Sequence, residues 1–170
     1  MLPTFIVIAG IILLWSIFLQ RKLTILDESV SNAMREIGVQ LSSIFDALTA
    51  LLDLSKSYAE SDSEKLIEMM KIKRNVITAK SIPDDVVLQE KLIQNILQEM
   101  TAITEKYPAL KTESIYIKVM DTVESHNKII RTSHMIYNNR VVKFNREIRN
   151  FPVFMIARLL GFRQRKYLEE

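Results

Sequence analysis

MIYNNRVVKFNREIRNFPVFMIARLLGF, residues 135–162, carries the pattern that decides the fold. Its large apolar residues recur at alternating spacings of four and three, at Tyr137, Val141, Phe144, Ile148 and Phe151. This rhythm gathers them into one stripe of an α-helix that packs lengthwise on other helices. The residue before a proline is pushed out of the helical conformation, so the helix should end at Phe151-Pro152. The stretch therefore predicts a long packed helix in an all-α protein.

Two long stripes of this kind are present in the chain. The stripe above begins further back and includes Tyr116, Met120, Val123, Asn127, Ile130 and His134. A second stripe lies within residues 23–58, at Val30, Met34, Ile37, Leu41, Ile44, Leu48 and Leu51. At the helical rise both helices would measure roughly 55–58 Å. Their matching lengths predict that they lie side by side.

Two shorter helices are expected between the long ones. Ser61 and Glu64 have the spacing of a capping box, which predicts a helix start there. This helix should carry Leu66, Met69, Met70, Lys73, Val76 and Ile77 up to the break at Ser81-Ile82-Pro83. Pro83, Asp84 and Asp85 favour the start of the next helix. That helix should end at Tyr107-Pro108, with an inward stripe of Val86, Ile93, Ile96, Met100 and Ile103.

The predicted fold class is all-α: an N-terminal transmembrane helix followed by an antiparallel up-and-down four-helix bundle with long first and last helices. One alternative stays open at this point. If the second and third helices are collinear across Pro83, their summed length also matches the long helices, and the body is a three-helix bundle.

Composition narrows the function classes. The chain has 170 residues, enough for one compact domain with an attachment, and no cysteine, which excludes disulfides and thiolate chemistry. The net charge of +3 is modest, and basic residues gather only in the last 30 positions. A nucleic-acid partner is therefore not expected.

The N-terminus has the character of a membrane anchor. Residues 1–20 contain no charged side chain and as a helix would reach roughly 30 Å, the thickness of a hydrocarbon core. A cleaved signal peptide would need a basic start and a small-residue cleavage site, and neither is evident. Arg21 and Lys22 follow the span, which predicts an outside N-terminus and a cytoplasmic body.

Three regions follow from these patterns: an anchor at 1–22, a helical bundle at 23–152 and a short basic amphipathic segment at 153–170. In a four-helix bundle the last segment returns to the membrane side. There it could contact anionic lipid through Arg158, Arg163, Arg165 and Lys166. The alternative is that Phe151, Leu159 and Phe162 fold back and close the base of the bundle.

Polar residues on the last long helix are candidates for fixing the helix register or for switching the helix packing. Asn138 and Asn145 lie one heptad apart beside the stripe and should hydrogen-bond a neighbouring helix, with a ligand or partner contact as the alternative. Asn127 and His134 lie within the stripe itself. His134 should either hydrogen-bond a neighbour or act as a pH-dependent switch.

Catalysis is not expected from the sequence. His126 and His134 would lie about 12 Å apart along a helix, too far to share a metal ion. No zinc-protease motif, glycine-rich phosphate loop or Glu-x-x-His pair is present. We therefore expect no enzyme, no cofactor and no metal site.

The C-terminal stretch resembles the signature of the LemA family, YNxxVxxFNxxIxxFPxxxxAxxxGF. The matching positions are Tyr137, Asn138, Val141, Phe144, Asn145, Ile148, Phe151, Pro152, Ala157, Gly161 and Phe162. Ser42, Ser43 and Ile44 stand where the family usually carries basic residues, which marks a divergent member. The resemblance implies a single-pass protein of the bacterial inner membrane with a helical soluble part and no agreed biochemical activity.

Taken together, the residues predict a non-enzymatic, membrane-anchored scaffold or docking protein. Its expected partners are the lipid bilayer and other membrane or cytoplasmic proteins, and heptad-rich helices are also compatible with a homo-oligomer. The alternative function is a membrane-tethered sensor that changes helix packing through Asn127 or His134.

Overall fold

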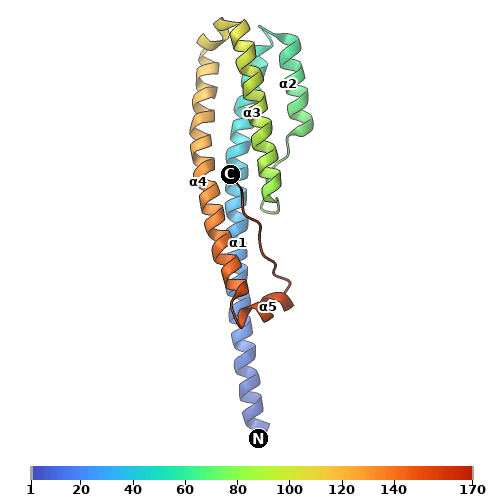
Figure 1. Cartoon of the computed structure of the whole chain (residues 1–170), viewed down its shortest axis with the longest axis vertical. Helices are drawn as coiled ribbons and strands as arrows, with labels where there is room; N and C mark the ends of the chain where they lie inside the picture. The colour runs from blue at the N-terminus through green and yellow to red at the C-terminus, as the bar shows by residue number, and fades with distance from the viewer. Residues whose placement is uncertain (1, 170) are drawn as a thin grey trace. The chain divides into compact units, whose positions relative to one another are not determined.

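The fold is entirely helical over the residues that the structure describes. The structure is a computed structural model that describes residues 2–169, with side chains from Ile6 onward. The helices are α1 (Leu2–Ser55), α2 (Glu60–Lys73), α3 (Pro83–Lys106), α4 (Ser114–Arg149) and α5 (Val153–Leu159), with a 3-10 turn, η1 (Pro108–Thr112), before α4 (Figure 1). No strand occurs within residues 2–169, so the all-α prediction is confirmed.

The chain divides into two compact units. Unit 1 holds the described residues of Met1–Ala33 and Ile136–Glu170, and unit 2 holds Met34–Met135. Unit 1 therefore contains the first part of α1, the end of α4, α5 and the C-terminal segment. Unit 2 contains the rest of α1 and α4 together with α2, α3 and η1.

The core of unit 2 consists of the predicted stripes. On α1 every stripe residue of this unit is buried: Met34, Ile37, Leu41, Ile44, Leu48 and Leu51. The α3 stripe is equally buried, at Val86, Ile93, Ile96, Met100 and Ile103. Both stripes are confirmed, because burial of apolar area is the main force that orders an amphipathic helix.

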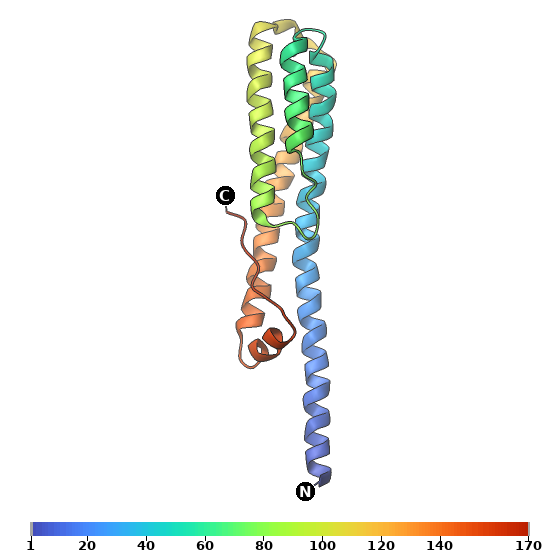
Figure 2. The same cartoon turned by 90° about the vertical axis from the view of Figure 1, so that its right-hand side faces the viewer.

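Helices α2 and α3 lie side by side (Figure 2). The start of α2 lies near the end of α3, where Lys106 Nζ is 3.8 Å from an Asp62 carboxylate oxygen. The collinear arrangement across Pro83 is therefore excluded. As predicted, α3 begins at Pro83, and the Asp85 carboxylate accepts a hydrogen bond from the Ile82 amide at 2.9 Å.

The second helix differs from the prediction at both ends. Its N-cap is Ala59, and the expected capping box is absent, because Ser61 and Glu64 already lie inside the helix. The helix ends at Lys73 rather than near Ala79. Gln89 of α3 explains this end, since its side chain donates to the Lys73 carbonyl and accepts from the Asn75 amide.

A close approach at Gly38 fixes the chain after α2. A Cβ atom added at Gly38 would lie 2.3 Å from the carbonyl oxygen of Ile77, which is a backbone atom. Only glycine permits this approach at no steric cost. The α2–α3 connection therefore packs directly onto the backbone of α1 within unit 2.

The α4 stripe is buried at six predicted positions and wrong at two. Val123, Ile130, Tyr137, Val141, Phe144 and Ile148 are buried. Tyr116, Met120 and His134 are half-buried, whereas Asn127 and Phe151 are exposed. Phe151 lies beyond Arg149, where α4 ends. A straight helix has 3.6 residues per turn and drifts about 20° per heptad from a strict seven-residue repeat. Neighbouring positions such as Val119 and Ser133 face inward as a result.

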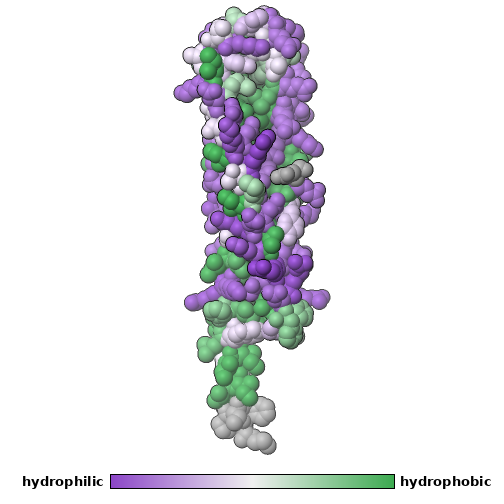
Figure 3. Space-filling model, turned by 60° about the vertical axis from the view of Figure 1, so that its left-hand side comes forward, coloured by the Kyte–Doolittle hydropathy of each residue, from purple (hydrophilic) through white to green (hydrophobic). Residues whose placement is uncertain are grey.

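In unit 1 the first part of α1 is apolar and mostly uncovered (Figure 3). Large apolar residues between Ile6 and Phe18 are exposed, and the first buried one is Leu19. Within the described residues, Ile6–Ser55 is the one helix long and apolar enough to cross a membrane, and 11% of its apolar window is buried. A helix of a soluble core would be covered. The end of α4 is fixed beside α1 by Lys22 and Glu147, whose Nζ and Oε1 atoms lie 2.6 Å apart.

Candidate functional site

The C-terminal segment returns along the end of α4 in unit 1. After α5 the chain is extended, and residues 163–169, here called the tail, pass beside α4 (Figure 1). Side chains of α4 hold this tail through its main chain, and a side chain of α1 holds it through the Arg165 guanidinium. We call the four residues that do so, Asp27, Tyr137, Asn138 and Asn145, the tail clamp.

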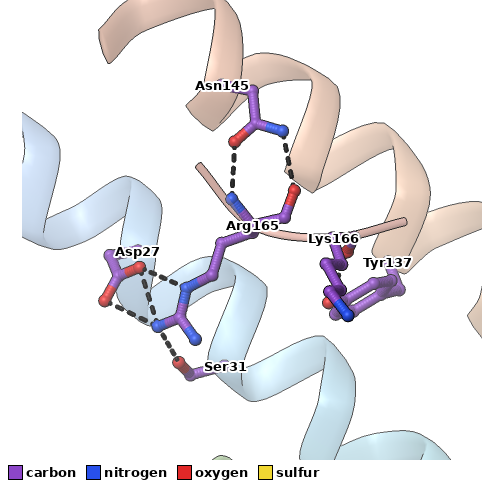
Figure 4. A network of polar contacts seen from close by, with 6 residues as sticks. All are labelled: Asp27, Ser31, Tyr137, Asn145, Arg165 and Lys166. Atoms are coloured by element: carbon purple, nitrogen blue, oxygen red, sulfur yellow. Dashed lines mark hydrogen bonds and ion pairs between the residues drawn. The ribbon is translucent and has the colours of Figure 1, made fainter. Parts of the chain in front are cut away.

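Asn145 makes a closed pair of hydrogen bonds with one residue of the tail (Figure 4). Its Nδ2 donates to the Arg165 carbonyl at 2.8 Å, and its Oδ1 accepts from the Arg165 amide at 2.8 Å. Asn145 is only 2% exposed, so both polar ends of its amide are satisfied away from water. This side chain replaces the partner strand that an extended backbone would otherwise need.

Asn138 repeats the same arrangement one heptad earlier. Its Nδ2 donates to the Leu168 carbonyl and its Oδ1 accepts from the Leu168 amide, each at 2.9 Å. Seven helical residues advance about 10.5 Å, which equals three residues of extended chain at about 3.3–3.4 Å each. The expectation that these amides bond a neighbouring helix was therefore wrong, because both bind the extended tail.

The side chain of Arg165 connects the tail to α1. Its Nε and Nη2 donate to the two carboxylate oxygens of Asp27 at 2.9 and 3.0 Å, and Nη2 lies 3.5 Å from the Ser31 hydroxyl (Figure 4). The fork geometry is favourable, but the side chains are 36% and 29% exposed, so water screens the pair. The Arg165 guanidinium is thus occupied by protein and not available to a membrane surface.

Tyr137 completes the clamp. Its hydroxyl donates to the Lys166 carbonyl at 3.0 Å, and its ring is buried. Burial raises the pKa of Tyr137 above its ordinary value of 10.0, while the positive charge of Arg165 opposes the shift. The neutral hydroxyl is therefore the form that the fold favours. Leu168 follows as the one buried side chain of the tail.

The remaining signature residues shape the turn that sends the tail back. Val141, Phe144 and Ile148 are buried along α4, and Ala157 is buried on the inner face of α5. Gly161, at φ +80°, ends α5, and the Phe162 amide then bonds the Ala157 carbonyl at 2.9 Å. This is the left-handed helix ending that glycine favours. Phe162 packs edge-on against Phe144, with ring centroids 6.2 Å apart.

Apolar side chains remain exposed at the base of unit 1. Phe151 is 80% and Leu159 is 86% exposed, so neither closes a bundle base; of the three residues expected there, only Phe162 packs inward. Arg158, Arg163 and Lys166 are exposed on the surface.

Unit 2 contains two histidine contacts. His126 Nδ1 lies 2.6 Å from Gln40 Oε1, and Gln40 in turn donates to Glu36. His134 Nε2 lies 3.0 Å from Glu90 Oε1, yet its angle is too poor for a hydrogen bond, so this buried nitrogen is unsatisfied. Asn127 is exposed and does not share a buried seam with His134.

Charged side chains of α2 and α3 gather at one cleft in the described part of the chain. Within residues 2–169 no three His, Asp or Glu side chains are close enough to hold a metal ion. A cleft between α2 and α3 contains Asp62, Lys65, Glu99 and Lys106. Asp62 faces both lysines at 3.8 Å, so this cleft pairs opposite charges.

Comparison with known proteins agrees with the resemblance in the signature. The model of the LemA family matches residues 33–170, well over half of the chain and every position of the signature. No curated protein matches the chain. The clamp residues of α4, the glycine ending and the buried α4 stripe lie within the matched region. The protein therefore belongs to the LemA family.

Proposed function

We propose that this protein is a single-pass, membrane-anchored docking module that works through its surfaces and without a chemical step. In this proposal residues 1–22 cross the bacterial inner membrane with the N-terminus outside. The cytoplasmic part is an antiparallel four-helix bundle that presents helix faces to other proteins.

The observation that carries the proposal is the uncovered apolar run of α1. Residues such as Ile11 and Leu14 are more than half exposed, and nothing within unit 1 covers them. Burying each such side chain is favourable by about 1.5–3 kcal/mol, and a bilayer provides that burial along the whole run. Arg21 and Lys22, which follow the run, support a cytoplasmic body.

Exposed apolar residues in unit 2 support the docking role. Ile72, Val76, Ile82 and Leu88 are all exposed around the connection between α2 and α3. Single exposed apolar residues are common, but several in one short stretch of the chain are typical of contact surfaces. The polar signature residues, by contrast, are occupied in holding the tail.

In-cell crosslinking tests the docking role. The full-length chain would carry a photo-crosslinking amino acid at Leu88, with the same group at exposed Lys118 of α4 as the matched control. We expect one discrete adduct from Leu88 that is absent from Lys118 and is reduced by Ile72→Ser. Equal or absent adducts from both sites would contradict docking through this connection.

A sensor is the second candidate, and the contact between His134 and Glu90 favours it. A protonated His134 would gain a charged partner in α3 that an unfolded chain lacks. As a sensor the chain should differ in stability between pH 5 and pH 7, and we expect this difference to disappear in His134→Gln, measured by urea unfolding. A flat profile in the unaltered chain would rule the sensor out.

A further inference from the structure

Helix α5 is apolar on two faces. Val153 and Ala157, four residues apart, are buried against the rest of unit 1. The other side of the helix and its flanks expose a second apolar set, which we call the foot. The foot consists of Phe151, Phe154, Met155, Leu159 and Leu160.

Such a helix does not suit an aqueous surface. An ordinary surface helix carries one apolar stripe toward the core and polar residues on its outer side. Here Arg158 is the only charged residue between Phe151 and Leu160. Contiguous apolar patches on soluble proteins are usually small, and larger ones mark contact with a protein or a membrane.

The position of α5 within unit 1 indicates what covers the foot. Lys22 of α1 pairs with Glu147 of α4, so the end of α4 lies beside the start of the covered part of α1. Leu19 is the first buried apolar residue after the exposed run. Within unit 1, α5 lies at the end of α4 in both views, near this boundary of α1 (Figures 1 and 2).

The apolar surface is continuous with that of the anchor. The space-filling view shows apolar side chains on the protruding part of α1 and again in the wider band directly above it (Figure 3). Hydrophilic residues predominate beyond that band. The order apolar span, apolar band and charged surface follows the layers of a bilayer and its headgroup region.

We propose that the foot lies in the interfacial layer of the same bilayer that α1 crosses. Its apolar side chains would enter the upper acyl region, and Arg158 and Arg163 would reach the anionic headgroups beside it. Seven helical residues alone would bind a membrane weakly. The anchor holds α5 at the surface already, so its insertion is an intramolecular event with a high effective concentration.

This inference rests on the proposed membrane anchor and adds a second lipid contact to it. It also assigns the second lipid contact to residues other than those that the sequence predicted. The sequence pointed to the basic tail, but Arg165 is bound to Asp27, whereas the foot residues are 40–86% exposed. The contact is therefore expected to be mainly apolar.

Fluorescence quenching by brominated lipid tests the proposal on the full chain. The chain has no cysteine, so a single cysteine can place a polarity-sensitive label at any chosen position. Three variants are needed: Leu159→Cys in the foot, Ile11→Cys in the apolar run of α1, and Ile72→Cys in unit 2, where Ile72 is 74% exposed. Each is reconstituted in vesicles of mixed zwitterionic and anionic lipids, with or without brominated acyl chains.

We expect the labels at Leu159 and Ile11 to be quenched at least twofold by brominated lipid and the label at Ile72 to be unaffected. The Leu159 emission should also shift to shorter wavelength than that of Ile72. Quenching at Ile11 without quenching at Leu159 overturns the foot and leaves the anchor in place. The absence of quenching at both positions overturns the anchor itself.

Discussion

Asn145 and Arg165 are joined by two hydrogen bonds of 2.8 Å, although twenty residues separate them in the chain. One helix side chain thereby binds both backbone polar groups of one residue. Asn138 does the same for Leu168. The asparagines of the signature are therefore best understood as a backbone-binding pair that returns the tail to the helix before it.

Loss of the Asn145 amide should release the tail. In Asn145→Ala the Arg165 amide and carbonyl lose their partners, and each lost hydrogen bond weakens the contact by about 0.5–1.5 kcal/mol. Hydrogen exchange at Arg165 should accelerate roughly tenfold or more, as 1.4 kcal/mol is tenfold in an equilibrium. Exposed Asn150, next to the end of α4, provides the control variant Asn150→Ala. Unchanged exchange at Arg165 would contradict the clamp.

Asp27 and Arg165 should contribute a modest coupling free energy to the stability of the fold. Both side chains are partly exposed, so a double-mutant cycle with Asp27→Ala and Arg165→Ala should give a coupling energy of about 0.5–1 kcal/mol that falls with added salt. The exposed pair Glu124 and Lys128 within α4 is the reference and should couple more weakly. Equal coupling in the two pairs would mean that the fork geometry contributes nothing.

High pH should loosen the tail through Tyr137. Burial raises the pKa of Tyr137 in the folded chain above that of an unfolded one. Its contribution to stability is therefore fully present below about pH 10 and is lost as pH rises through the folded pKa. Tyr137→Phe should remove that alkaline loss and also the bond to Lys166, at a cost of about 0.5–1.5 kcal/mol near neutral pH. Unfolding measured between pH 8 and 11 for both chains checks this, and parallel profiles would contradict it.

Gly38→Ala should destabilise unit 2. Alanine normally favours a helix over glycine by about 1 kcal/mol, but here its Cβ would meet the Ile77 carbonyl oxygen at 2.3 Å. Overpacking of this kind costs about 1–3 kcal/mol. Gly10→Ala, where nothing lies within 4 Å, is the matched control and should be neutral or stabilising. The thermal unfolding midpoints of both variants test this prediction. A stabilised Gly38→Ala chain would contradict it, because it would show that the α2–α3 connection moves freely away from the added Cβ atom.

The spacing of apolar residues correctly predicted the features that depend on local sequence. The stripes of α1 and α3 and the end of α3 at Tyr107-Pro108 are local consequences of periodicity and proline, and they hold in the structure. The α4 stripe failed at Asn127, where the drift of a straight helix turned the residue outward, and at Phe151, which lies beyond the end of α4 at Arg149. The end of α2 was missed because Gln89, sixteen residues beyond Lys73, determines it.

The sequence singled out the asparagines of the tail clamp but not the residues that they bind. Asn138 and Asn145 stood out by their spacing, yet their partners lie in a tail whose extended form has no periodic signal. No sequence pattern singled out Asp27, since its importance depends on Arg165, which is 138 residues away. The contact between Gln40 and His126 was missed for the same reason. Such long-range pairs become visible only when the helices are placed.

The most direct test of the central claim is the fate of the full-length chain when cell membranes are washed with alkaline carbonate. That wash releases proteins held by charge or by other proteins and leaves those that span the bilayer. We predict that the chain stays in the membrane pellet, and that Ile11→Arg combined with Leu14→Arg moves a large share of it to the supernatant. Complete release of the unaltered chain into the supernatant would contradict the account.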